Sequence, residues 1–152
     1  DIMTLGKALG GGLPVGAILA KPERAAFFKP GTHGCTLGGN PICTAAAATV
    51  FDVIEREHLT VSTAETGELI KNSILSFAAR GNKIKEVRGM GLFIGIEMSI
   101  ADATPVVNRA LENGLVINVT QKNVLRVCPS LIISRQQIQQ GLDILFGAIA
   151  DV

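Results

Sequence analysis

DIMTLGKALGGGLPVG, residues 1–16, places a single lysine, Lys7, between an apolar run and three consecutive glycines. Glycines at 10–12 let the backbone turn tightly and come close to a bulky ligand. A lysine at a strand end beside close-packed backbone is poorly solvated, and desolvation favours the neutral amine. A neutral amine in a fixed position is the nucleophile that imine formation with a carbonyl compound requires. On composition alone, a solvated surface lysine before a flexible loop remains the alternative.

The composition of the 152 residues predicts a folded chain, because 47% of them are hydrophobic and 18% are charged. This length suits one domain or parts of two. A net charge of +1, with neither Trp nor Tyr, argues against a nucleic-acid partner. The apolar runs are too short to cross a membrane. The three cysteines lack C-x-x-C spacing, which is typical of reduced thiols in a cytoplasmic protein and predicts neither disulfides nor a metal site.

The first part of the chain reads as strand, short helix, polar loop and long helix. Residues 15–20 form a continuous apolar run, typical of a strand buried on both faces of an α/β sheet. A short helix is expected from Pro22 to Phe28. Asn40 and Pro41 suit the N-cap and first turn of a helix over residues 41–56.

The second part predicts a small α+β unit in which helices pack on an antiparallel or mixed sheet. Residues 61–80 carry an apolar helical stripe that includes Leu69 and Ile74. Residues 91–98 alternate as a strand does, and Ser134 with Gln137 forms a capping box for the last helix. Further elements are a helix over 104–113, with Leu111 on its buried side, and strands over 115–119 and 124–127.

Two later segments could bind anions. The loop over residues 31–41, GTHGCTLGGNP, combines hydroxyls, glycine amides and a helix N-terminus, which together hold phosphate well. An ordinary loop that ends in an N-cap is the alternative. Arg126 lies on an apolar strand, where burying it unpaired is costly. It needs a carboxylate, from a substrate or from an internal Asp or Glu. The segment 86–92 is interpreted as structural, with its charges at a solvated rim, and Glu97 as exposed or interfacial.

The three segments, in this order, resemble the class III, pyridoxal-phosphate-dependent aminotransferases, in particular their acetylornithine branch. The similarity runs over essentially the whole chain. It implies an α/β fold, the C-terminal part of a fold-type I pyridoxal-phosphate-dependent transferase. Residues 1–55 would end the large cofactor-binding domain, including a linker helix, and residues 56–152 would form the small α+β C-terminal domain.

The resemblance also implies roles for individual residues. Lys7 would carry pyridoxal 5'-phosphate covalently and act as the catalytic proton carrier, and Thr36 would bind the cofactor phosphate. Cys35 stands where the family usually has a Ser or Thr that contacts substrate, and Leu37 replaces the usual aromatic residue. Arg126 would bind the α-carboxylate of amino-acid and 2-oxo-acid substrates. The family implies a homodimer with shared active sites, in which the loop around Thr36 reaches the neighbouring subunit.

The implied reaction moves an amino group from N-acetylornithine, or a related ω-amino substrate, to 2-oxoglutarate in arginine biosynthesis. Ornithine, succinylornithine, succinyldiaminopimelate and 4-aminobutyrate aminotransferases are the near alternatives. A non-catalytic dimerisation remnant of the same fold is a third possibility. A nucleotide-binding domain is disfavoured because the glycine run lacks G-x-x-x-x-G-K-[ST] spacing. The chain begins without Met inside the lysine motif, so we expect a piece of a longer protein with little activity alone.

Overall fold

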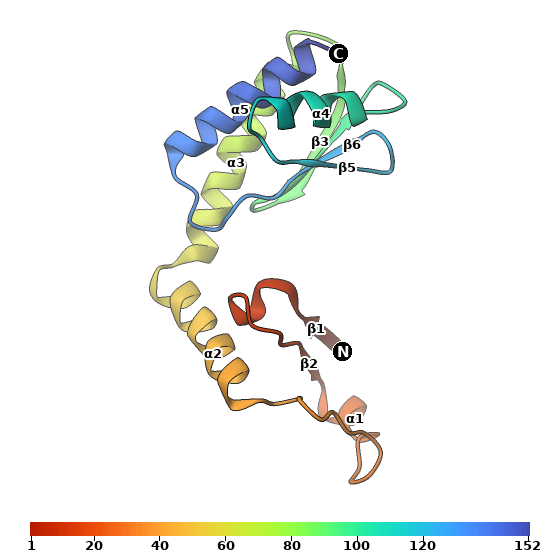
Figure 1. The fold of residues 1–152 in the computed structure, drawn as a ribbon, viewed down its shortest axis with the longest axis vertical. Coiled ribbons are helices and arrows are strands. Elements are labelled where there is room, and N and C mark those ends of the chain that lie inside the picture. The colour runs from red at the N-terminus through yellow and green to blue at the C-terminus, as the bar shows by residue number, and fades with distance from the viewer. The chain divides into compact units, whose positions relative to one another are not determined.

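The computed structural model describes residues 1–152, which form two compact units, Asp1–Glu57 and His58–Val152 (Figure 1). The first unit contains β1 (Ile2–Leu5), the 3-10 helix η1 (Lys7–Gly10), β2 (Ala17–Ala20), α1 (Pro22–Ala25) and α2 (Pro41–Arg56). The second contains α3 (Leu59–Ala78), β3 (Ile84–Met90), β4 (Phe93–Met98), α4 (Thr104–Glu112), β5 (Asn118–Thr120), β6 (Val124–Val127) and α5 (Arg135–Ala150).

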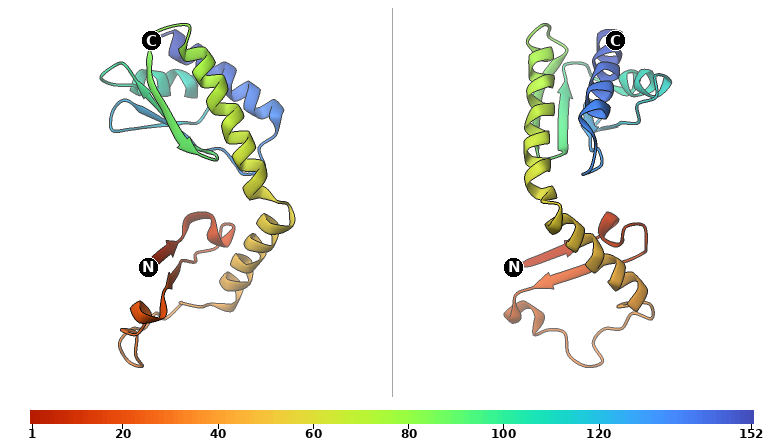
Figure 2. Two further views of the ribbon diagram at one scale, coloured as in Figure 1. Left: turned by 180° about the vertical axis from the view of Figure 1, so that it is seen from behind. Right: turned by 90° about the vertical axis from the view of Figure 1, so that its left-hand side faces the viewer.

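In the first unit, β1 and β2 pair as an antiparallel hairpin, drawn as neighbouring arrows of opposite direction in Figure 2. The prediction of a strand buried on both faces over residues 15–20 is wrong. The strand begins at Ala17, and Ile18 and Leu19 are 67% and 47% exposed. Two strands alone offer too little surface to bury either face of a sheet.

The long helix of the first unit begins where the sequence predicts. Asn40 Oδ1 accepts hydrogen bonds from the backbone N–H groups of Ile42, at 3.0 Å, and Cys43, at 3.4 Å. Pro41 occupies the first turn, where its missing N–H costs nothing. The helix expected over residues 22–28 is shorter and ends at Ala25.

The second unit is built on a four-stranded antiparallel sheet in the order β3-β4-β6-β5. The predicted alternation along β4 is confirmed, because Ile94, Ile96 and Met98 are buried while the residues between them face the other way. The strand β3 was not expected. Its sequence, IKEVRGM, is rich in charged residues and lacks the regular apolar alternation that predicts a strand.

Helices α3, α4 and α5 supply the other half of one hydrophobic core, and α3 lies beside α5 in Figures 1 and 2. Gly67 of α3 lies against the turn between β3 and β4, where a Cβ atom would lie within clashing distance of the carbonyl oxygen of Gly91. The predicted stripe is partly wrong: Ile74 is fully buried, whereas Leu69 is exposed. Leu111 is also exposed, because α4 turns Val106 and Ala110 fully into the core and Val107 partly against it.

The sequence predicts the cap of α5 correctly but not that of α4. The capping box of α5 is confirmed, since Ser134 and Gln137 each accept a hydrogen bond from the other's backbone N–H. Helix α4 instead uses Asp102, whose Oδ1 accepts from the backbone N–H and hydroxyl of Thr104. None of the helices is both long and apolar enough to traverse a lipid bilayer.

The core of the second unit can be tested with a matched pair of adjacent residues on α3. Ile74 is completely buried and Leu75 is 46% exposed. We expect Ile74→Ala to lower the free energy of unfolding by about 2–5 kcal/mol, because it leaves a cavity. Leu75→Ala should cost far less, since its side chain keeps much of its contact with water. Urea unfolding followed by circular dichroism measures both, and equal losses would contradict the assigned core.

Candidate functional site

Lys7 is separated from β1 by one residue, Gly6, and is the first residue of η1. Its backbone has a positive φ of 59°, a left-handed conformation that lysine adopts at an energetic cost. Lys7 was expected to be shielded from water, and this is wrong for this chain because Lys7 is exposed. The buried residues of η1 are Leu9 and Gly10. The backbone, rather than surrounding side chains, therefore sets the direction of Lys7. Strained conformations of this kind cluster at functional sites.

Cys35 and Thr36 are exposed and lie in a turn that precedes α2. The backbone N–H of Gly38 donates to the carbonyl oxygen of Cys35 at 3.1 Å and closes the turn. A Cβ atom on Gly38 would come within 2.8 Å of Cys35 Cβ, so only glycine permits this approach. Thr36 is thus a central residue of a tight turn, and its exposed side chain is accessible to a ligand. Asn40, the N-cap of α2, lies four residues later.

Arg126 lies on β6 and is exposed. Its Nε donates a hydrogen bond to Asn118 Oδ1 at 3.0 Å, and it forms no ion pair within the chain. The alternative of an internal Asp or Glu partner is therefore wrong, and so is the expectation of burial. The strand places Arg126 on the sheet face that no helix covers. Its terminal guanidinium nitrogens are available to a carboxylate.

The predicted site residues are divided between the two units. Lys7, Cys35 and Thr36 belong to the first unit, and Arg126 belongs to the second. Within the first unit no hydrogen bond joins Lys7 to the turn that holds Cys35 and Thr36. No cluster of His, Cys, Asp and Glu side chains suitable for a metal ion is present, and the three cysteines are free thiols.

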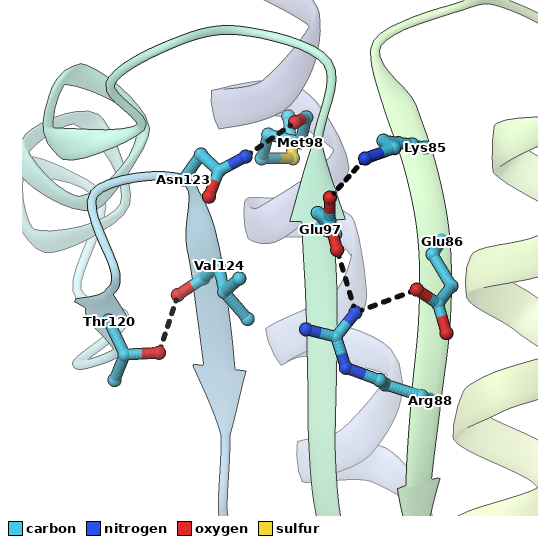
Figure 3. A network of polar contacts seen from close by, with 8 residues as sticks. All are labelled: Lys85, Glu86, Arg88, Glu97, Met98, Thr120, Asn123 and Val124. Carbon is cyan, nitrogen blue, oxygen red and sulfur yellow. Dashed lines mark hydrogen bonds and ion pairs between the residues drawn. The ribbon is translucent and has the colours of Figure 1, made fainter.

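The open face of the second unit's sheet carries an ionic network of Lys85, Glu86, Arg88 and Glu97 (Figure 3). Lys85 Nζ donates to Glu97 Oε1 at 2.6 Å, and Arg88 Nη1 donates to Glu97 Oε2 and to Glu86 Oε2, each at 2.9 Å. The hydrogen bonds from Lys85 and Arg88 hold the pKa of Glu97 below its ordinary value. The charges predicted at a solvated rim, on Glu86 and Arg88, are 54% and 44% exposed, whereas the side chain of Glu97, expected on an exposed or interfacial face, is only 17% exposed.

A hollow on this open face is lined both by Arg126 and by Arg88, one member of the network. It is lined by Arg88, Phe93, Gly95, Thr120, Val124 and Arg126. This cluster could not be predicted from local sequence patterns, because its members come from four strands. The available signal was the alternation along β4: once Ile94 and Ile96 face the core, Gly95 and Glu97 must share the opposite face.

Comparison with known proteins identifies the family. Residues 1–149 match the family described as aminotransferase class III. The chain belongs to the class III aminotransferases. The acetylornithine aminotransferase of Caldanaerobacter subterraneus subsp. tengcongensis is 40% identical over 152 residues, which is 100% of this chain and 38% of that protein. The chain thus spans about two-fifths of the length of the curated relatives it matches.

Solved structures of class III aminotransferases have the same fold as this chain. The crystal structure of acetylornithine aminotransferase from Elizabethkingia anophelis matches with a TM-score of 0.90 and 34% identity, covering 100% of this chain and 41% of that one. The ornithine aminotransferase of Toxoplasma gondii matches with a TM-score of 0.92 and 30% identity, over 100% of this chain and 37% of that one. That enzyme has partial occupancy of pyridoxal phosphate at its active site. The predicted fold class is confirmed, and the family uses this cofactor.

The ionic network can be tested by its pH dependence. Because the pKa of Glu97 is lowered in the folded chain, its contribution to stability is present above the ordinary carboxyl range and is lost as the pH falls through the lowered pKa. Glu97→Gln should therefore lower the urea midpoint by more at pH 7 than at pH 3. Glu65→Gln, at an exposed helical position without an ion pair, is the control. Equal losses from Glu97→Gln at both pH values would contradict the role of charge.

Proposed function

We propose that this chain supplies the cofactor lysine and the substrate-carboxylate arginine of an aminotransferase that acts on N-acetylornithine and 2-oxoglutarate. The observation that carries the proposal is Lys7. An exposed amine in a strained backbone conformation follows β1, just before a glycine run, in a chain whose family uses pyridoxal phosphate. Acetylornithine aminotransferases among its relatives support N-acetylornithine as the amino donor.

The residues present fit pyridoxal phosphate by their chemistry. Lys7 offers the amine that can bond covalently to the cofactor's aldehyde carbon. Thr36 offers a hydroxyl at a tight turn ahead of a helix N-terminus, which suits a phosphate. When bound, the cofactor supplies the electron sink that lets a proton leave the substrate carbon that bears the reacting amino group. In this assignment Lys7 holds the cofactor and then carries that proton.

The substrate side of the site is assigned to Arg126 and Cys35. The terminal nitrogens of Arg126 can form a two-pronged pair with the α-carboxylate of an amino acid or a 2-oxo acid. Cys35 contributes a small side chain beside Thr36 and contacts substrate there. Ornithine is the second candidate donor, favoured by the match to the Toxoplasma gondii enzyme.

The wider assignment follows the same reasoning. Residues 1–55 are proposed as the end of the large cofactor-binding domain and residues 56–152 as the small domain. The active enzyme is proposed to be a cytoplasmic homodimer with shared active sites, serving arginine biosynthesis. The exposed apolar side chains of the first unit support a role in larger assembly, among them Ile2, Ile18, Phe27, Leu37 and Ile42.

Covalent labelling tests the lysine assignment. The chain is incubated with pyridoxal phosphate, reduced with borohydride and digested, and the adduct is located by mass spectrometry. We expect the adduct on Lys7, because it is the lysine placed for imine formation. Lys7→Arg should abolish that adduct, since a guanidinium does not form a stable imine, whereas Lys29→Arg should leave it unchanged. Labels scattered over the surface lysines would overturn the proposal.

Turnover by the 152-residue chain alone is a second test. The lysine, one phosphate ligand and the carboxylate arginine are assigned here, but no residue of the chain is assigned to the acid that must pair with the pyridinium nitrogen. We therefore expect little or no conversion of N-acetylornithine with 2-oxoglutarate, measured by glutamate formation. A normal rate from the purified chain would show that these residues suffice and would refute this division of the site.

A further inference from the structure

Four charged side chains on the open face of the sheet form ion pairs with one another, whereas Arg126 on the same face forms none. Lys85 and Arg88 balance Glu86 and Glu97 through three short contacts. Arg126 lines the same hollow as Arg88 but has only a neutral partner, the amide of Asn118. A free guanidinium beside four paired charges needs an explanation, because a nearby carboxylate would normally be drawn to it.

The strand register brings Glu97 close to Arg126. Gly95 pairs with Arg126, and Glu97 pairs with Val124, so Glu97 is the diagonal neighbour of Arg126 on the same face. Diagonal neighbours lie about 7–8 Å apart at the backbone, within reach of long side chains. Gly95 contributes no side chain to separate them. Strands β5 and β6 contain no acidic residue, so Glu97 is the carboxylate on the strand next to Arg126.

Both oxygens of Glu97 are nevertheless turned toward β3. Lys85 holds Oε1 and Arg88 holds Oε2. Lys85 lies at the shift in register between Ile84 and Glu86, and its ammonium reaches Glu97 on β4. On the other side, Asn118 fixes Arg126 through its Nε and leaves the two terminal nitrogens free. Glu97 and Arg126 are thus held by opposite neighbours.

We propose that Lys85 and Arg88 are positioning residues that hold Glu97 away from Arg126 and so keep Arg126 available to a substrate carboxylate. This inference rests on the proposed function, since it deepens the role given there to Arg126. Without the two cations, Glu97 would swing toward Arg126 and compete with the carboxylate of the incoming acid. This competition would lower the affinity for the substrate and would not affect the proton transfer at Lys7.

A titration of the 152-residue chain with 2-oxoglutarate tests the inference without any catalytic turnover. The readout is the side-chain Nε–Hε nuclear magnetic resonance signal of Arg126, assigned by its loss in Arg126→Lys. In the unchanged chain this signal should shift saturably. In the double variant Lys85→Met with Arg88→Met, we expect about two- to fivefold weaker affinity, the size of a newly formed exposed ion pair. Lys85→Met alone should weaken binding in the same direction by less.

Rescue by a third substitution separates competition from mere loss of structure. Adding Glu97→Gln to the double variant should restore affinity, because the competing charge is removed. Adding Glu86→Gln makes the same charge change on β3, two strands from Arg126, and should not restore it. Lys71→Met with Arg109→Met removes two other paired cations of the second unit and should leave affinity unchanged.

The possible failures are distinguishable. Unchanged affinity in the double variant, or equal rescue by Glu97→Gln and Glu86→Gln, overturns the positioning role alone. A signal of Arg126 that does not respond to 2-oxoglutarate in the unchanged chain overturns its carboxylate role and the inference with it. Failure of Lys7 to take the borohydride label refutes the proposed function in a separate experiment, in which Arg126 plays no part.

Discussion

The alternation of side chains along β4 is the constraint on which the second unit depends. Ile94, Ile96 and Met98 face the core that α3, α4 and α5 complete, and burial of these side chains fixes the register with both neighbouring strands. A slip of one residue would bury Glu97 and expose the isoleucines. The same alternation therefore fixes which residues stand on the open face and sets Gly95 opposite Arg126. Core packing and site geometry are two consequences of one pattern.

The first unit lacks such a core, and its organisation is local. Leu9 is its one buried hydrophobic side chain, and the hairpin β1–β2 leaves large apolar residues in contact with water. Lys7 and the turn at Cys35 are consequently placed by backbone features: a positive φ, a hydrogen-bonded turn and the capped start of α2. These features determine where each polar group is attached, while the apolar surface around them remains available for packing.

Local patterns in the sequence predicted the elements whose causes are local. Asn40 with Pro41, Ser134 with Gln137 and the alternation along β4 each encode their structure within a few residues. What could not be predicted depends on contacts between distant residues. The strand β3 is stabilised by pairing with β4, not by its own charged sequence. The exposure of Lys7 and Arg126, and the meeting of Glu97 with Lys85 and Arg88, required knowledge of which surfaces the helices cover.

The charge arrangement on the open face has a clear physical reason if Arg126 binds a carboxylate. A side-chain carboxylate attached a few ångströms away has an effective concentration in the millimolar range or above. Small-molecule substrates are typically bound from micromolar to millimolar concentrations, so such an internal competitor would occupy the guanidinium much of the time. The ion pairs of Glu97 with Lys85 and Arg88 remove that competition and keep the net charge of the face close to zero. A neutral amide then suffices to orient Arg126, because an amide restrains a guanidinium without neutralising its charge.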